Sequence, residues 1–413
     1  MRQSIIFILY LLCTFTARSQ SVLTPEQAGS IYYAYPAPPS TYTSAPAGYE
    51  PFYISHYGRH GSRWMTADER YTEVICVFDS LYQCSELTPL GVDVRKRLHK
   101  VWEDARGCSG SITPLGERQH REIAERMYRN FPQVFRGGAF IDARSSTSLR
   151  CAMSMSYFTE RLKELNPGLQ VNRRAYHRYM DYIAYTSPEG EKFASEKAPW
   201  RRGFREFEKK NVRPERLMAS LFVKPEAITD QDAMMRSLYW IAADMQNVEL
   251  DLSFYDIFEY EELVGVWKTV NARMYVCNAA APLNGGLMPR CAVPLLRNIL
   301  ESADAAIEKG TPAADLRFGH DTHLIRLLAL MQIEGCSNQE VDMEKFHLAW
   351  QDYRVSPMGA NLQLIFYRDK KNDILVKFLL NECEVTLPLK GKMVPYYSWK
   401  EVETFLAEVI GKE

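Results

Sequence analysis

No long apolar run follows the first residues of this 413-residue chain. The stretch from Ile5 to Phe15 is apolar, but it is too short to cross a bilayer, which takes about 20 residues in a helix. Arg2 precedes it, and Ala17-Arg18-Ser19 before Gln20 has the small-x-small form of a signal-peptidase site. We therefore predict that residues 1–19 are a signal peptide, that the mature protein is periplasmic or extracellular, and that it has no membrane span.

The chain also lacks an excess of charge of either sign. Its 50 lysines and arginines balance 51 aspartates and glutamates, which argues against a broad basic surface for nucleic acid or membrane. No repeat or low-complexity tract is present, and 46% hydrophobic residues can bury a large core. We expect a folded protein that acts on a small molecule, with any anion site confined to one place.

Cys-x-x-Cys pairs are missing, and the histidines are not spaced as zinc ligands, so we predict no metal site and no cofactor. Of the 9 cysteines, all but Cys13 follow the predicted signal peptide, and an even number in an exported chain argues for disulfides. Candidate pairs are Cys336 with Cys383 and Cys277 with Cys291, whereas Cys151 is a candidate free thiol. The other three are Cys76, Cys84 and Cys108.

What the chain does contain is a cluster of arginine and histidine after a strand-like run. Residues 56–66 read HYGRHGSRWMT and follow Phe52-Tyr53-Ile54-Ser55. Guanidinium is always charged, and its planar fork matches two phosphate oxygens at once. Arg59 and Arg63 can therefore neutralise a dianion while His60 faces its phosphorus atom. This pattern predicts nucleophilic phosphoryl transfer, and the alternative is a structural histidine.

Two further segments offer partners for this cluster. Thr113-Pro114-Leu115-Gly116 is typical of a helix start, with threonine as N-cap and proline at the first helical position. Residues 139–143 read as a short strand that runs into Arg144-Ser145-Ser146-Thr147-Ser148-Leu149-Arg150. Helix N-termini favour anions, so Arg150 is a candidate third cation, although the same pattern fits an ordinary capped helix.

The last partner segment is Leu316-Arg317-Phe318-Gly319-His320-Asp321-Thr322-His323, followed by the apolar run from Leu324 to Met331. A strand that ends at Gly319 and turns into a helix would place His320 and Asp321 near Arg59 and His60. In open α/β sheets, ligands gather outside the carboxyl ends of the strands. We therefore expect all these groups at one edge of the sheet.

In this order the motifs resemble the histidine acid phosphatases, branch 2 of the phosphoglycerate-mutase-like superfamily, which includes phytases and multiple inositol polyphosphate phosphatases. The resemblance runs from about Phe52 to Arg368. A weaker echo is Ser356-Pro357-Met358-Gly359-Ala360-Asn361. The resemblance implies an α/β, phosphoglycerate-mutase-like three-layer sandwich with an inserted, mainly helical domain.

The resemblance also implies a role for each residue of the motifs. His60 would be the nucleophile that becomes phosphohistidine, and Asp321 would protonate the leaving group. Loose phosphoryl transfer needs positioning and charge stabilisation, which arginines supply without a metal. A phosphate beside Asp321 would raise the pKa of that carboxyl and favour an acidic optimum. The implied phosphate ligands are Arg59, Arg63, Arg150 and His320, and Thr66 is a candidate substrate contact.

Two departures leave the substrate open. Many phytase-like members have proline two residues after the second arginine, where this chain has Met65. The inositol polyphosphate phosphatases usually carry His-Ala-Glu as the donor motif, but this chain has His320-Asp321-Thr322. Sugar phosphates and inositol polyphosphates such as phytate are both expected substrates. The alternatives are a phosphoglycerate-mutase-like phosphotransferase, which the export signal disfavours, and a phosphate-ester binding protein without turnover.

Hydrophobic periodicity predicts how the chain is divided. Residues 24–51 are rich in proline and tyrosine and predict an irregular lead-in over the surface. Residues 20–168 and 311–413 carry alternating strand and helix patterns and form the predicted α/β phosphatase domain. Residues 169–310 show helical patterns without convincing strands and form the predicted helical cap. The oligomeric state is left open.

Overall fold

The computed structural model describes residues 23–36, 41–391 and 393–411. The predicted signal peptide and Cys13 lie outside these residues. Within the described part of the chain, no helix is both long enough and apolar enough to cross a membrane.

A single mixed sheet forms the middle layer, and its strands follow the order β3-β2-β4-β1-β5-β6-β7, with β8 pairing with β6. Strands β1, β4, β2 and β3 run parallel, whereas β5, β6 and β7 are antiparallel to their neighbours. Arg59 pairs with Gly319, and Ser145 pairs with Phe318, so β1, β4 and β2 end at the same edge. The strands are β1 (Glu50–Arg59), β2 (Phe140–Ser145), β3 (Gln170–Arg174), β4 (Ala314–Gly319), β5 (Asn361–Arg368), β6 (Ile374–Leu380), β7 (Cys383–Val385) and β8 (Tyr396–Ser398).

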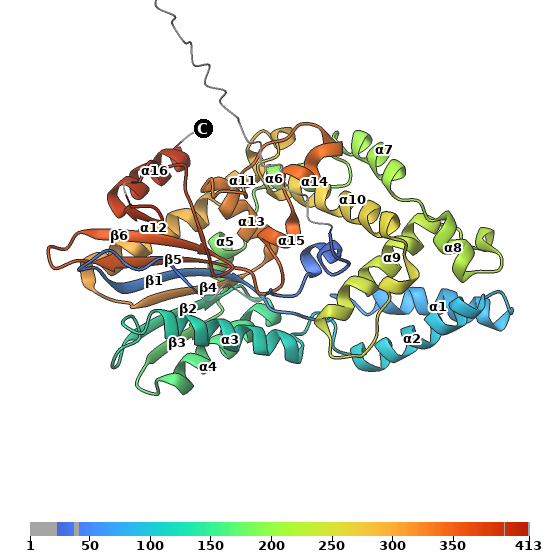
Figure 1. Cartoon of the computed structure of the whole chain (residues 1–413), viewed down its shortest axis with the longest axis horizontal. Helices are drawn as coiled ribbons and strands as arrows, with labels where there is room; N and C mark the ends of the chain where they lie inside the picture. Colours follow the sequence, from blue (N-terminus) through green and yellow to red (C-terminus); the bar gives the residue numbers. More distant parts are fainter. Residues whose placement is uncertain (1–22, 37–40, 392, 412–413) are drawn as a thin grey trace, which may run out of the picture.

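Helices cover both faces of this sheet (Figure 1). On one face, α3 (Pro114–Asn130) and α4 (Leu149–Leu165) bury apolar side chains such as Ile123 and Phe158 against the strands. On the other face lie α5 (Met180–Ile183), α12 (Val293–Lys309), α13 (Asp321–Leu330) and α16 (Trp399–Gly411). The expected three-layer α/β arrangement is confirmed.

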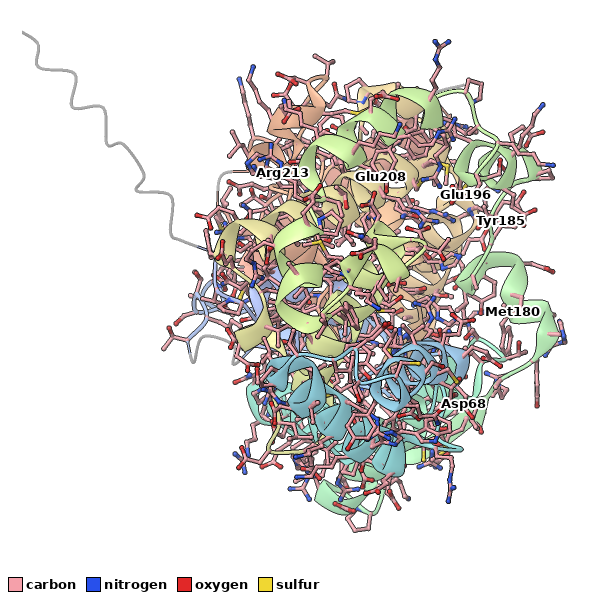
Figure 2. All side chains as sticks on the ribbon, turned by 90° about the vertical axis from the view of Figure 1, so that its right-hand side faces the viewer. Asp68, Met180, Tyr185, Glu196, Glu208 and Arg213 are labelled. Carbon is pink, nitrogen blue, oxygen red and sulfur yellow. The ribbon has the colours of Figure 1, made fainter. Side chains whose placement is uncertain are left out.

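A second, helical region stands beyond the edge of the sheet where β1 and β4 end, and Figure 2 looks onto it. Its separate apolar core includes Phe78, Leu98, Leu238 and Trp267. The short 3-10 helix η1 (Gln27–Tyr32) packs between this region and the sheet. The helices are α1 (Glu69–Gln83), α2 (Pro89–Ala105), α7 (Arg201–Asn211), α8 (Glu215–Leu221), α9 (Gln231–Asp244) and α10 (Tyr260–Asn278), with the short α6 (Pro188–Ala194), α11 (Leu287–Arg290), α14 (Phe346–Ala349) and α15 (Asp352–Val355) nearby.

The packing of three segments differs from the expected division at residues 169 and 310. Strand β3, at the start of the predicted cap, pairs with β2 and extends the sheet. Helix α12, at the end of the predicted cap, packs against β1. Helices α1 and α2, from the predicted α/β segment, share the core of the helical region with α8 and α9. These helices have ordinary amphipathic patterns, which do not specify the surface that each apolar face covers.

The eight cysteines of the described residues have free thiols, so the expected disulfides are absent from the structure. Cys336 is buried, whereas Cys383 is exposed on β7. The Sγ of Cys291 contacts the carbonyl oxygen of Leu287 at 3.6 Å instead of pairing with Cys277. Cys151 is a free, buried thiol, as expected, and it donates to the carbonyl oxygen of Gly319 at 3.1 Å.

Candidate active site

The six predicted catalytic and phosphate-binding residues come from three loops that meet at one edge of the sheet. Arg59 ends β1, and His60 and Arg63 follow it, while Arg150 lies in the first turn of α4 after β2. His320 and Asp321 join β4 to α13. The imidazole rings of His60 and His320 lie 5.8 Å apart between their centroids. Parallel strands and short turns thus bring together residues that are far apart in the sequence.

The surroundings of His60 select one tautomer of its ring. Its Nδ1 lies 2.9 Å from the carbonyl oxygen of Gly61, which can only accept a hydrogen bond, so Nδ1 carries the proton. Nε2 then holds a free electron pair. Burial lowers the pKa of His60 well below 6.5, and the charges of Arg59, Arg63 and Arg150 lower it further. His60 is therefore a neutral imidazole in a positive environment and is suited to attack an electrophilic phosphorus atom.

Arg59 is fully buried, and one side of its guanidinium is anchored by the protein. Its Nη1 donates to the carbonyl oxygens of Ile31 at 2.6 Å and Ser356 at 2.7 Å. The echo segment seen in the sequence therefore supports this arginine. Nε and Nη2 have no hydrogen-bond partner among the described residues, and Nη2 lies 3.4 Å from Asp321 Oδ2. Burial lowers the Arg59 pKa to about 10, although Asp321 acts in the opposite direction.

Arg63 is positioned by Tyr32, a residue that the sequence analysis did not single out. Arg63 Nη1 donates to the Tyr32 hydroxyl at 3.1 Å and to the Trp64 carbonyl oxygen at 2.9 Å. Its guanidinium carbon lies 4.8 Å from the centroid of the Tyr32 ring. Burial lowers the Arg63 pKa, but Tyr32 and Asp244 outweigh that effect and raise it overall. The Tyr32 hydroxyl proton has no acceptor among the described residues, so it is available to an anion.

Arg150 and His320 complete the candidate site. Arg150 is partly buried, and its Nε has no partner in the described part of the chain. His320 Nε2 lies 3.4 Å from Ser146 Oγ. Burial lowers the pKa of His320 to about 4, and Arg150 adds to this effect. Nearly all buried polar groups in proteins find a partner. Unpartnered N–H groups on Arg59, Arg63 and Arg150 around one histidine thus indicate a site built for an oxyanion.

Asp321 departs from expectation in one respect. Its pKa lies below the usual range: burial raises it, but Arg59, a hydrogen bond from the Thr322 backbone N–H at 2.8 Å, and His320 lower it more. The expected upward shift depends on a neighbouring phosphate, whose charge opposes that of Arg59. The carboxyl is partly exposed, so it can meet a leaving group.

The predicted helix start at Thr113 packs against the loop that carries His60. Thr113 caps α3 by accepting from the Gly116 N–H at 3.2 Å, and its own N–H donates to the Ser62 carbonyl oxygen at 3.0 Å. A Cβ at Gly61 would lie 2.7 Å from the Gly116 carbonyl oxygen, and a Cβ at Gly116 only 2.1 Å from that of Ser62. Glycine is required at both positions because the two backbones touch.

A buried network joins this loop to the helical region. Ser62 Oγ donates to Asn247 at 2.8 Å, and the Asn247 side-chain amide donates to the Tyr32 carbonyl oxygen at 2.9 Å. Tyr71 donates to the buried Asp244 at 2.7 Å, and burial raises the Asp244 pKa to about 7. Apart from Ser62, none of these residues lies in a recognisable motif. Only their packing around the loop reveals them.

The predicted substrate contact Thr66 and the residue His323 lie at the margin of the site. Thr66 is exposed. It lies near Arg150, because a Cβ atom built on Gly110 would be 3.9 Å from both the Thr66 Cα and the Arg150 Nη1. His323 Nδ1 lies 3.2 Å from Thr322 Oγ1, and its ring centroid lies 6.1 Å from that of His320. His56, which precedes the site residues on β1, is buried against Phe158 and Phe318.

Comparison with solved structures shows the same fold elsewhere. The multiple inositol polyphosphate phosphatase of Bifidobacterium longum, in complex with inositol hexasulfate, has a TM-score of 0.79 at 18% sequence identity, over 93% of this chain and 98% of that one. Its complex with phosphate has a TM-score of 0.80 at 19% identity, with the same coverage. The phytase from D. castellii has a TM-score of 0.72 at 15% identity, over 94% of this chain and 85% of that one.

No match was found among curated protein sequences. A family model, in contrast, covers most of the chain. It describes the histidine phosphatase superfamily (branch 2) and matches residues 58–381, which include all six residues of the site and the strands that carry them. The chain therefore belongs to the histidine phosphatase superfamily, branch 2.

Proposed function

We propose that this protein is an exported phosphoric monoester hydrolase that works through a phosphohistidine at His60. The observation that carries the proposal is the set of unpartnered arginine N–H groups around a neutral, buried imidazole. Nε2 of His60 attacks phosphorus, the alcohol leaves, and water then hydrolyses the phosphohistidine. Covalent catalysis divides one difficult displacement into two easier ones.

The arginines and His320 stabilise the charge that spreads over the phosphoryl oxygens. Arg59 is rigidly held through Ile31 and Ser356, and Arg63 through Tyr32 and Trp64, so little reorganisation is needed as the charge develops. Pre-positioned donors in a buried site are worth more than the same groups in water.

Asp321 is the proposed general acid. Arg59 holds the carboxyl beside the site at 3.4 Å, and a bound phosphate dianion would counter the effect of that arginine on the Asp321 pKa. The protonated carboxyl would then give its proton to the leaving alkoxide and later accept one from the attacking water.

The proposed substrates are inositol polyphosphates, phytate among them, or sugar phosphates. The fold shared with the Bifidobacterium longum phosphatase, which binds inositol hexasulfate, supports the first class. Thr322 stands where those phosphatases usually carry glutamate, and this difference leaves room for the second class. Export rests on the sequence of residues 1–19 alone.

The test combines a variant with a chemical trap. His60→Ala should abolish hydrolysis of p-nitrophenyl phosphate near pH 5 while leaving the far-UV circular dichroism unchanged, and wild type quenched rapidly in denaturant should carry acid-labile phosphate. His56→Ala is a control for the loss of a buried imidazole outside the site. Substantial turnover by His60→Ala would refute the nucleophile, and transfer of the phosphoryl group to added alcohol rather than water would favour a phosphotransferase. Wild type that binds phosphate esters without turnover would be a binding protein.

A further inference from the structure

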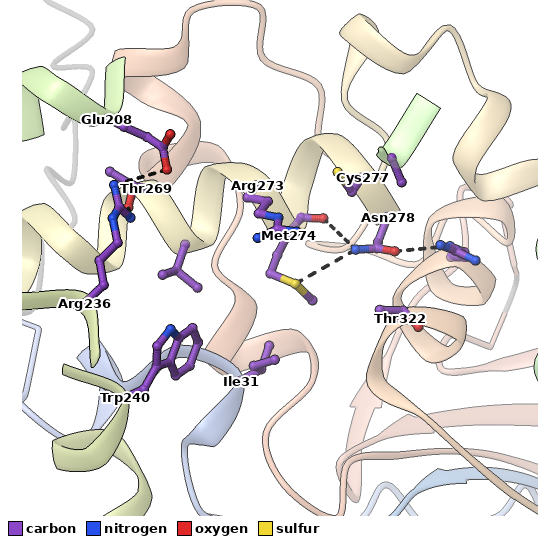
Figure 3. Close-up of a pocket in the computed structure, with 13 residues that line it drawn as sticks. Ile31, Glu208, Arg236, Trp240, Thr269, Arg273, Met274, Cys277, Asn278 and Thr322 are labelled. Atoms are coloured by element: carbon purple, nitrogen blue, oxygen red, sulfur yellow. Dashed lines mark hydrogen bonds and ion pairs between the residues drawn. The ribbon is translucent and has the colours of Figure 1, made fainter. Parts of the chain in front are cut away.

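A cavity of about 450 Å³ lies beside the proposed general acid, between α9, α10, α13 and η1 (Figure 3). Trp240 and Ile31 form apolar parts of its lining. Thr322 also lines it, and the backbone N–H of this residue donates to Asp321 Oδ1. The cavity therefore adjoins the catalytic carboxyl on the side of the helical region.

Three arginines line this cavity, and they differ in how their charges are balanced. Arg236 lies 3.1 Å from Glu208, a carboxylate that also lines the cavity, and Arg273 lies 3.3 Å from Glu196. Figure 2 labels both carboxylates on the helical side of the molecule. These two arginines therefore have protein partners of opposite charge.

Arg326 has no such partner. It is 6% exposed, and its guanidinium bonds only to neutral groups, Asn278 Oδ1 at 3.2 Å and Thr186 Oγ1 at 2.7 Å. These bonds use Nε and Nη1, while Nη2 has neither a hydrogen-bond partner nor an ion pair among the described residues. A buried charge is costly to fold unless it is paired.

The acidic groups near Arg326 do not supply that pairing. They are the thiols of Cys291 and Cys277, the phenol of Tyr57 and the carboxyl of Asp321. Burial raises the pKa of the Cys277 thiol and of the Tyr57 phenol, which keeps both neutral. The Cys291 Sγ contacts the carbonyl oxygen of Leu287 at 3.6 Å. Asp321 attracts Arg326 from beyond ion-pair distance, but its carboxylate lies beside Arg59. Arg326 is thus a buried cation whose counter-charge must come from outside the described protein.

We propose that this cavity is a subsite for a second anionic group, a phosphate or carboxylate carried by the leaving group of the substrate, and that Arg326 binds it. The inference rests on the proposed phosphatase function and deepens it. An alcohol whose oxygen takes its proton from Asp321 must lie on the Asp321 side of phosphorus, and Thr322, the next residue along the chain, lines the cavity. Arg236 and Arg273 add positive potential at the wall, while their carboxylates limit their direct contribution.

The test compares Arg326→Met with wild type on glucose 6-phosphate and glucose 1,6-bisphosphate. Methionine keeps the length of the side chain and removes the charge. We expect KM for the bisphosphate to rise roughly ten- to hundredfold, because a charge-assisted contact is lost. KM for the monophosphate should stay within about twofold, which also shows that the variant folds. Arg326→Lys retains the charge, so its KM for the bisphosphate should lie between that of wild type and that of Arg326→Met.

The control is the same substitution at Arg368. This residue ends β5 and pairs with the start of β1, at the opposite end of that strand from the site. Arg368→Met should alter neither KM. If Arg326→Met raises KM for both substrates equally, or for neither, the subsite is refuted while the phosphatase function stands. If wild type hydrolyses neither substrate, nor any other phosphomonoester, the proposed function itself fails.

Competition with inorganic sulfate tells whether the subsite binds a second anionic group of the substrate or a free anion. In the proposed arrangement, sulfate should compete with the bisphosphate in wild type more strongly than in Arg326→Met. Sulfate that instead changes kcat for the monophosphate, in an Arg326-dependent manner, would identify a site for a free effector anion and overturn the proposal. Should Arg326→Met fail to fold, Arg326→Lys decides: a preference for the bisphosphate that is reduced but not lost, with an unchanged KM for the monophosphate, would support the contact, and an unchanged preference would contradict it.

Discussion

Tyr32→Phe is the sharpest test of how the structure positions the proposed phosphate-binding arginines. The substitution removes one oxygen from a side chain that is 4% exposed, while the ring contacts with Arg63 at 4.8 Å and Trp240 at 5.0 Å persist. Arg63 Nη1 then keeps only the Trp64 carbonyl oxygen, and Nε already lacks a partner. The perturbation therefore acts on the placement of one buried guanidinium.

The expected magnitude follows from the contact that is lost. A hydrogen bond to a charged group contributes about 1.5–3 kcal/mol, and each 1.4 kcal/mol corresponds to a factor of about ten. We expect kcat/KM to fall roughly 10- to 100-fold, toward the lower end if the ring alone holds the guanidinium. Because Arg63 serves every substrate, activated aryl and alkyl phosphates should be affected alike.

The assay is kcat/KM for p-nitrophenyl phosphate and for glycerol 2-phosphate, together with the inhibition constant of inorganic phosphate. Tyr33→Phe is a matched control, since the neighbouring tyrosine packs against Tyr353 and its hydroxyl has no hydrogen-bond partner among the described residues. A Tyr32→Phe enzyme within twofold of wild type for both substrates and for phosphate inhibition would refute the positioning role.

Three further predictions address the acid, the folded state and the charge carriers. Asp321→Asn should slow glycerol 2-phosphate hydrolysis roughly 10²- to 10⁴-fold and p-nitrophenyl phosphate hydrolysis far less, because only the alkoxide leaving group needs a proton. Equal losses for the two substrates would make Asp321 an orienting residue and direct the search for the proton donor to His323. Burial lowers the pKa of His120 from 6.5 to about 3. Between these pH values the folded state thus binds fewer protons than the unfolded state, and the free energy of unfolding falls as pH drops from 6.5 toward 3. His120→Leu should reduce the slope of the unfolding free energy against pH by about 1.4 kcal/mol per pH unit, as measured by chemical denaturation. An unchanged slope would contradict a neutral His120. Because buried arginines carry the positive charge, dialysis against EDTA should leave activity unchanged, and a loss that Mg²⁺ or Zn²⁺ restores would overturn that account.

Local patterns were sufficient for the parts of the fold that lie within a short stretch of chain. Thr113 and Pro114 begin a helix as predicted, because an N-cap and a proline at N1 act on the first turn alone. The alternating strand and helix pattern predicted for residues 311–413 also matches β4, α13, β5, β6 and α16. The glycines and charged residues after β1 and β4 predicted one shared edge, because parallel strands with short turns end side by side.

Amphipathic helices were harder to place than to detect. Helices α1 and α2 follow β1 directly, yet their apolar faces join the core of the helical region rather than the sheet. The strand β3 was missed because it is short and mostly polar on the edge of the sheet. Its pairing with β2 supplies a stabilisation that no window of local sequence contains.

The sequence by itself determined which chemical groups the loop after β1 carries, since Arg59, His60 and Arg63 lie within five residues of one another and their functional groups are intrinsic. Only the tertiary structure decided what holds these residues and what surrounds them. Tyr32 and Ile31 lie in a segment without a motif, and Arg326 lies in an apolar helical run. Their roles arise from contacts between distant segments, where burial removes water and leaves each charge dependent on the particular partners that packing provides.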